Sequence, residues 1–317
     1  MAWLRELDQA RYEDPERVLS ELEAARSRVP ASHQPRYFGV YGSTHRMLAG
    51  RSQQSEPCLE RAEELLRFGR WIAERRGDDS AFADLLLRSS YVLSDRGDYR
   101  QALVLAEQAN ALFERCQDRV GRGRALFEQG RFLFYLNRTA EAIEAYYAAL
   151  RLLPTSEQSN LFSVHQGLGL CFQRQGQYQK ALKHALRAEA LVPSPWFEAK
   201  LYWLQAHIYR GLEKHYLAEQ RLTRAADMLS ALHYGEAALA AVELVQLQML
   251  QGKTKAAGDT LRSIIGLVIP LGGNHEVAAA IVELMRDKLT LEAVETARRQ
   301  IETAKECSQW HSLAVEP

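Results

Sequence analysis

The chain has 317 residues, of which 47% are hydrophobic and 25% are charged, and its 40 basic side chains balance 40 acidic ones. A net charge of zero argues against a nucleic-acid-binding protein, because such proteins need an excess of positive charge on one face. The longest apolar run, from Ile264 to Leu271, is too short to span a bilayer. We therefore expect neither direct nucleic-acid binding nor membrane insertion.

The cysteines and the first residues favour a cytoplasmic protein. Cys58, Cys116, Cys171 and Cys307 are far apart and form no CxxC pair, which is typical of reduced thiols in a reducing compartment. The N-terminal sequence is charged and amphipathic, and it lacks the apolar core of a signal peptide.

Helix-forming residues dominate the chain, and no stretch alternates between apolar and polar residues with a period of two, so we predict an all-α fold. In chain order, the first helix is expected from Trp3 to Ala10. The second is expected to begin with Asp14 as the N-cap and Pro15 at the first helical position, and to end before Pro30.

The rest of the chain predicts further antiparallel helix pairs. A helix from Pro35 to Leu48, a polar loop from Ala49 to Pro57 and a helix from Cys58 to Arg76 come next. The last pair is expected at His275 to Asp287 and Thr290 to Glu306. The prediction is a single solenoid over residues 1–307, with an N-terminal capping pair at 1–30, repeats at 31–79, 80–118, 119–156, 160–195, 196–234 and 235–271, a C-terminal capping pair at 274–306, and a tail at 308–317.

Internal repetition supports this division. Alanines recur at a spacing of 37 to 40 residues, at Ala62, Ala102, Ala142, Ala181, Ala218 and Ala257. A small residue precedes four of them by 12 positions, at Ser90, Gly130, Gly169 and Ala206. We expect these residues at close contacts between helices, because small side chains let the backbones approach. Gly176 is expected to end a helix with a positive φ.

One segment shows the repeat most clearly. Residues 162–195 space Leu168, Gly169 and Phe172 in their first half and Ala181, Ala185 and Ala188 in their second, with Pro193 after the last turn. This pattern resembles the tetratricopeptide repeat (TPR), whose usual period is about 34 residues. The resemblance implies a right-handed α-solenoid of about seven antiparallel helix pairs, in which the first helix of each repeat lines a concave groove. The longer period is similar to that of several bacterial TPR regulators.

The resemblance also implies where a partner would bind. Groove side chains would lie on the first helix of each repeat, one to three residues from the packing positions. The predicted groove residues are Arg88, Tyr91, Arg124, Phe127, Arg131, Phe134, Tyr135, Gln166, Gln173, Arg174, Lys200, Trp203, His207 and Arg210. Aromatic residues and arginine are typical of binding hot spots, so we expect a partner segment with acidic and apolar residues. The alternative is that the arginines are solvated and the aromatics pack between neighbouring repeats.

Motifs for catalysis, cofactors and metals are missing from the sequence. No GxxxxGK[ST], GxGxxG, GxSxG or HExxH motif occurs. His207 and His215 are eight residues apart, but the helix break expected at Gly211 separates them. We therefore predict no catalytic residue, no cofactor and no metal site.

Three hypotheses for the function follow, and we favour the first. It is a non-enzymatic scaffold that binds a partner protein or peptide in its groove and could also form a homo-oligomer. The second is a TPR regulator that senses a peptide or metabolite and acts on a separate effector chain, because no effector domain is recognisable. The third is a catalytic role, or a Rap-like protein that accelerates dephosphorylation of a response regulator, with Gln166 and Gln173 as candidate polar residues.

Overall fold

The computed structural model describes residues 2–49, 55–232, 234–268 and 290–307, and every regular element within those ranges is a helix. The described chain is thus an all-α solenoid of helix pairs, as predicted. These residues form two compact units that divide within helix α9 (Gln158–Arg174). The first unit runs to Gly167 and the second begins at Leu168.

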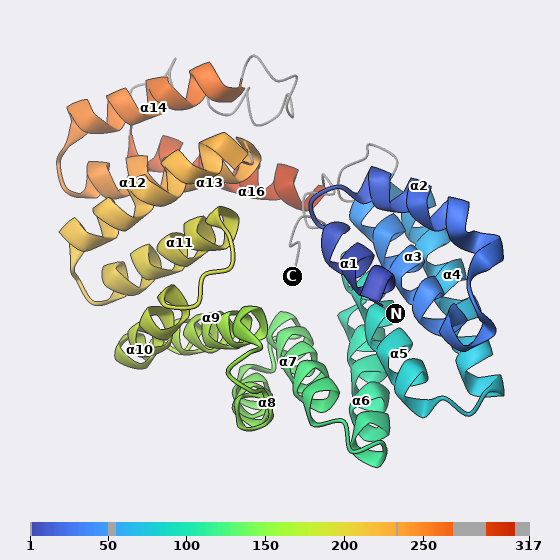
Figure 1. Ribbon diagram of the computed structural model, residues 1–317. Helices are drawn as coiled ribbons and strands as arrows, with labels where there is room; N and C mark the ends of the chain where they lie inside the picture. Colours follow the sequence, from blue (N-terminus) through green and yellow to red (C-terminus); the bar gives the residue numbers. More distant parts are fainter. Residues whose placement is uncertain (1, 50–54, 233, 269–289, 308–317) are drawn as a thin grey trace. The chain divides into compact units, whose positions relative to one another are not determined.

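The first unit contains four helix pairs in chain order. They are α1 (Ala2–Ala10) and α2 (Pro15–Ala25), α3 (Gln34–Ala49) and α4 (Ser55–Arg75), α5 (Asp79–Asp95) and α6 (Tyr99–Arg115), and α7 (Arg119–Tyr135) and α8 (Thr139–Leu152), with two short 3-10 turns, η1 (Arg26–Arg28) and η2 (Ala31–His33), after α2. Helices α5, α6 and α7 pack side by side with alternating direction (Figure 1). The apolar faces of α1 and α2 pack on α3, where the buried Tyr37 donates a hydrogen bond to the carbonyl oxygen of Leu22 at 2.9 Å.

The second unit continues the same pairing. Its helices are α10 (Tyr178–Glu189), α11 (Pro195–Gly211), α12 (His215–Leu232), α13 (Tyr234–Leu250), α14 (Thr254–Val268) and α16 (Leu291–Cys307). Leu229 of α12, Val242 of α13 and Val294 of α16 are fully buried in one apolar core. The predicted helix from His275 to Asp287 and the predicted tail at 308–317 lie outside the described residues.

Helix starts follow the sequence signals closely, with one correction. Asp14 caps α2 as predicted, because its carboxylate accepts a hydrogen bond from the backbone N–H of Arg17 at 3.0 Å, with Pro15 next in the chain. Helix α4 begins at Ser55, however, so the prediction that the loop continues to Pro57 was wrong. Pro57 lies in the first turn of α4, where backbone N–H groups have no acceptor within the helix, so the N–H that proline lacks costs no hydrogen bond.

The alignment of small residues is confirmed by their burial. The six repeating alanines are each 0 or 1% exposed. A Cβ atom on Gly130 would lie only 2.7 Å from the ring of Tyr146, and one on Gly169 would lie 3.1 Å from Leu204. These positions are therefore close helix contacts, as the repeat pattern predicts.

The turns inside the helix pairs share one backbone conformation. Gly97, Asn137, Gly176 and Glu213 occupy aligned positions and have φ values of 78°, 60°, 70° and 59°. The next residue closes each turn by donating its N–H five residues back, as Lys214 does to the carbonyl oxygen of Tyr209 at 2.9 Å. The positive φ predicted for Gly176 is confirmed.

Glu213→Gly is expected to raise the free energy of unfolding by about 0.5 kcal/mol. A left-handed backbone conformation costs a residue with a Cβ about 1–2 kcal/mol, and glycine avoids this cost. Glycine also has more conformational freedom in the unfolded chain, which offsets part of the gain in stability. Glu213 is exposed, so little side-chain packing is lost. Urea denaturation measures the difference, and Lys214→Gly, one residue later, serves as the matched control. A Glu213→Gly protein no more stable than the wild type would contradict the expectation.

Candidate partner-binding surface

The predicted groove residues lie on α5, α7, α9 and α11, the first helices of their pairs (Figure 1). Their environments become comparable when positions are counted from the aligned small residue of each helix, taken as zero. That residue is Ser90 in α5, Gly130 in α7, Gly169 in α9 and Ala206 in α11.

Positions −6, +1 and +4 leave side chains partly or fully accessible. Residues three and seven apart lie on one face of a helix, so these positions form a stripe on each of the four helices. We call it the open stripe, and it consists of Asp84, Arg124, Ser163 and Lys200 at −6, Tyr91, Arg131, Leu170 and His207 at +1, and Phe134, Gln173 and Arg210 at +4. Ser94, the remaining +4 residue, is buried. Two further predicted residues, Tyr135 and Arg174, are exposed at position +5, at the C-terminal ends of α7 and α9.

Position −3 belongs to the interior in three of the four helices, which corrects part of the prediction. Phe127 is 4% exposed, and its ring centroid lies 6.1 Å from that of Tyr146 on α8. Leu87 and Trp203 occupy the same position and are also buried, whereas Gln166 is half-buried. Phe127 therefore packs between helices, as in the alternative considered for the aromatics, because its position lies one turn before a close helix contact.

Arg88 of α5 is anchored to α1. Its Nη1 and Nη2 donate to Oδ1 and Oδ2 of Asp8 at 3.0 and 2.8 Å, and its Nε donates to Asp84 at 2.7 Å. Burial opposes the ionisation of Asp8, but the guanidiniums of Arg88 and Arg11 outweigh it and hold the pKa of Asp8 well below its ordinary value. Arg88 therefore already has carboxylate partners from its own chain.

Two arginines lie close to the ring of Tyr91. The guanidinium carbons of Arg46 and Arg131 lie 5.1 and 5.8 Å from the Tyr91 ring centroid, within the range of cation–π contacts. Arg46 donates through Nε and Nη2 to Asp95 at 2.6 and 3.2 Å, and Arg131 donates through Nε to Glu128 at 2.8 Å. The Tyr91 ring is therefore held by charged groups that are themselves paired.

Two further predicted residues of the first unit, Arg124 and Tyr135, also contact side chains of their own chain. Arg124 donates through Nε and Nη2 to both carboxylate oxygens of Glu157, at 2.8 to 3.2 Å. Tyr135, which is 47% exposed, stacks on Tyr99 with centroids 4.6 Å apart. The carboxylates that pair with arginines of this surface are Asp8, Asp84, Asp95, Glu128 and Glu157. The positive charge expected of the groove is therefore balanced within the first unit.

In the second unit, a lysine side chain contacts two tryptophan rings. The Lys200 ammonium lies 5.4 Å from the ring centroid of Trp196 and 5.3 Å from that of Trp203. Arg174 and Arg210 are exposed at the C-terminal ends of α9 and α11. Arg88 and Arg131 of the first unit are less accessible than these two arginines, because they are only partly exposed.

Glu243 of α13 organises the polar side chains beside Trp203. Its Oε2 accepts from Trp203 Nε1 at 2.8 Å and lies 3.1 Å from His207 Nε2. Arg210 Nη2 is 3.1 Å from His207 Nδ1, and a guanidinium only donates, so Nδ1 accepts and Nε2 carries a proton toward Glu243. Burial raises the pKa of Glu243, but the hydrogen bonds from His207 and Trp203 outweigh it and lower that pKa, so the carboxylate is ionised at neutral pH.

Sequence reasoning missed Asp8, Arg46 and Glu243, and a signal existed for the last. Counting 12 residues back from Ala257 places Glu243 at position −2 of α13, the position that Arg88 and Glu128 occupy in α5 and α7. A charged residue beside the packing position in several repeats indicates a buried polar network, because an unpaired charge would be costly there.

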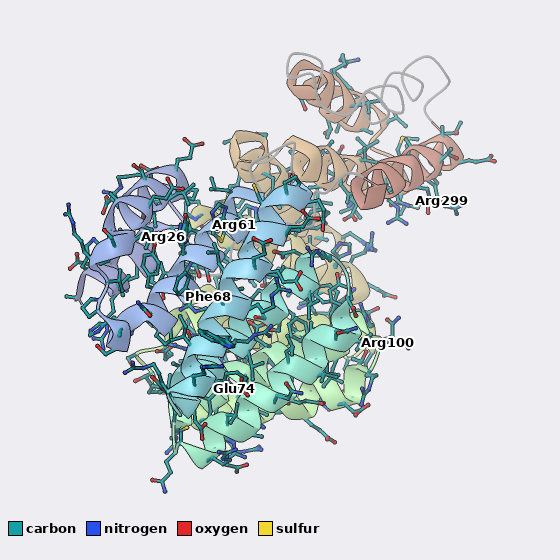
Figure 2. The ribbon with its side chains drawn as sticks, turned by 90° about the vertical axis from the view of Figure 1, so that its right-hand side faces the viewer. Arg26, Arg61, Phe68, Glu74, Arg100 and Arg299 are labelled. Carbon is teal, nitrogen blue, oxygen red and sulfur yellow. The ribbon has the colours of Figure 1, made fainter. Side chains whose placement is uncertain are left out.

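An exposed aromatic pair on α4 was also missed. Phe68 and Trp71 are 47 and 48% exposed and stack with centroids 5.6 Å apart, and Arg75 lies over Trp71. Figure 2 shows Phe68 along the same helix as Arg61 and Glu74. Aromatic and arginine side chains are enriched at interfaces, so this pair is a second accessible surface of that composition.

Within the described ranges, no group of three or more His, Cys, Asp or Glu side chains could hold a metal ion. In that part of the chain, no helix combines the length and the apolar character needed to cross a bilayer.

Comparisons with known proteins agree with this architecture. The family model for the tetratricopeptide repeat matches residues 123–155, which lie within α7 and α8 and the segment after them. A Rap protein complexed with competence and sporulation factor aligns with a TM-score of 0.67 and 14% identity, over 99% of this chain and 93% of that one. The apo form of the quorum sensor NprR from B. thuringiensis aligns with a TM-score of 0.58 and 13% identity, over 84% of this chain and 85% of that one.

A third structure, BtubC from P. vanneervenii, aligns with a TM-score of 0.55 and 16% identity, over 74% of this chain and 93% of that one. A search of curated protein sequences gives no match. At these identities the structural likeness concerns the fold.

Proposed function

We propose that this chain, which contains a tetratricopeptide repeat at residues 123–155, is a non-enzymatic interaction protein that binds a partner protein or peptide along the open stripe. The composition of the stripe carries the proposal. Accessible positions on successive first helices hold arginine, lysine and aromatic side chains, which contribute most at binding hot spots.

The two units offer a partner different chemistry. In the first, a partner carboxylate must replace Asp8, Asp84 or Glu157 at an arginine, so binding there is an exchange of ion pairs with little net gain. In the second, Arg174 and Arg210 are exposed at the C-terminal ends of their helices, where a partner carboxylate can reach them from solvent. We therefore expect acidic residues of the partner to contribute chiefly in the second unit, and apolar residues beside Tyr135 and Phe134 in the first.

A regulator is the second candidate function. The Rap structure that aligns along nearly the whole chain is a complex with competence and sporulation factor, and NprR is a quorum sensor. By analogy, a peptide or small metabolite would bind the open stripe and alter the action of a separate effector chain. A ligand that binds only the folded protein raises its melting temperature by an amount that grows with the ratio of ligand concentration to Kd, so a shift produced by a small peptide or metabolite would favour this candidate over a scaffold for large partners.

Charge reversal in the second unit tests the proposal. Peptides selected from a random library against the whole protein are expected to be acidic and apolar. Their affinity for an Arg174→Glu, Arg210→Glu variant should fall at least tenfold, because two exposed attractive charges become repulsive. Isothermal titration calorimetry measures the affinities. The control is Arg187→Glu on α10, an exposed arginine of a second helix.

Either of two results would remove the open stripe of the second unit from the proposal. One is an unchanged affinity of the selected peptides for the double variant. The other is an equal loss in the Arg187→Glu control, which would show a general charge effect and no site.

A further inference from the structure

The first unit contains a cavity that shares no residue with the open stripe. It has a volume of ≈ 300 Å³ and lies between α1, the end of α2 and the turns η1 and η2. It is lined by Trp3, Leu4, Ala25, Arg28, Val29, Pro30 and His33. Arg26, labelled in Figure 2, begins η1, and the last residue of that turn, Arg28, lines the cavity. Ligand pockets measure roughly 300–1,000 Å³, so this one suits a small molecule.

The local backbone explains why a space remains here. Helix α2 ends at Ala25, and Val29 and Pro30 take extended conformations with ψ of 118° and 146°. The extended segment therefore carries the chain away from the end of α2 before η2 leads into α3, and the cavity lies beside this segment. Leu4 of α1 is 2% exposed and covers the apolar core, while Trp3 next to it remains 37% exposed at the cavity.

The cavity is apolar apart from two basic side chains. Leu4, Ala25, Val29 and Pro30 present hydrocarbon, and no acidic residue lines the cavity. Arg28 is exposed, and among the residues that the structure describes no carboxylate lies within ion-pair distance of it. The lining thus combines an apolar surface with an uncompensated positive charge.

We propose that this cavity binds a small amphipathic carboxylate with about eight carbons in total. Its hydrocarbon chain would lie against Leu4, Val29 and Trp3, and the carboxylate would pair with Arg28 or His33. The space taken by one water is about 30 Å³, so the cavity holds roughly ten non-hydrogen atoms, the size of octanoate. Burial of the hydrocarbon supplies most of the affinity, and the charge selects carboxylates over neutral molecules.

Octanoate is the probe, and the neutral 1-octanol is its comparator. Calorimetry on the full chain, below the micelle concentration, should show saturable binding of one octanoate per chain. Octanol should bind about three- to fivefold more weakly, because it lacks the ion pair. Arg28→Gln should reduce the preference for octanoate over octanol. Equal affinities of the wild type for octanoate and octanol, or no saturable binding of octanoate, would overturn the proposal.

A cavity-filling variant locates the site. Ala25→Leu places three more carbon atoms in the cavity and should weaken octanoate binding more than tenfold. The matched control is Ala24→Leu, because Ala24 is exposed on the same helix and does not line the cavity. Circular dichroism verifies that both variants fold. Wild-type affinity in Ala25→Leu, or an equal loss in Ala24→Leu, would place octanoate elsewhere and overturn the assignment.

Trp3 gives an independent readout. Octanoate should change the tryptophan fluorescence of the wild type, and the change should disappear in Trp3→Phe while calorimetry still detects binding. Persistence of the full fluorescence change in Trp3→Phe would contradict the proposed location. None of these measurements depends on peptide binding at the open stripe, so the two proposals can fail separately.

Discussion

Asp95→Ala is expected to lower the free energy of unfolding by about 3–5 kcal/mol, the usual cost of leaving one partner of a buried ion pair alone. The side chains of Arg46 and Asp95 are only 8 and 7% exposed, and two hydrogen bonds join them. Without Asp95, the Arg46 guanidinium would remain between helices with poor access to water. Urea denaturation followed by circular dichroism measures the change.

Two further variants separate an unpaired charge from lost packing. Arg46→Met, Asp95→Leu removes both charges and should return to within about 1–2 kcal/mol of the wild type. Arg138→Ala breaks a pair with Glu141 in which the two side chains are 48 and 53% exposed, and it should leave the free energy of unfolding close to that of the wild type. A cost for Asp95→Ala as small as that of Arg138→Ala would show that the pair is not buried in solution.

The same pair supports the open stripe. Arg46 lies over the Tyr91 ring while its guanidinium is fixed by Asp95, and Arg131 lies within cation–π range of the same ring. Tyr91 is therefore positioned by residues of three helices before any partner arrives. A side chain held in place loses little rotamer entropy on binding, so Tyr91 is well suited to serve as an anchor.

The helix contacts of this protein could be predicted because they depend on residue size. An alanine or glycine is required wherever two helix backbones approach, so the pattern recurs at Ala102, Ala142 and Ala181 despite changes around it. The turns were predicted less completely. Gly176 signals a positive φ by its identity, whereas Glu213 adopts one because the surrounding helices impose it.

The surface chemistry was harder to predict because it depends on partners that are distant in sequence. Arg88 looked like a free groove cation, but Asp8, which lies 80 residues away, pairs with it. Trp203 looked like a groove aromatic, but Glu243 from the next repeat accepts its N–H. Repetition indicates which helices are neighbours. It does not indicate which of several long side chains meet across them, because small changes in rotamer decide that.

Ala181→Leu is expected to lower the free energy of unfolding by about 1–3 kcal/mol. Ala181 is 0% exposed, and its carbonyl oxygen lies 3.7 Å from the place where a Cβ of Gly169 would stand. Helices α9 and α10 are therefore in close contact there, and a larger side chain must separate them or leave its preferred rotamer. In a solenoid each repeat contacts only its neighbours, so distant movements cannot relieve the strain.

Ala190→Leu is the matched control for this variant, because Ala190 is exposed at the end of the same helix and should tolerate the change within about 0.5 kcal/mol. Chemical denaturation of both variants gives the comparison. Equal midpoints would mean that Ala181 does not lie at a helix contact in solution. The alignment that counts positions from Gly169 would then be shifted. Gln173 and Arg174 would no longer belong to the accessible face of α9, and the partner-binding surface of the second unit would have to be redrawn.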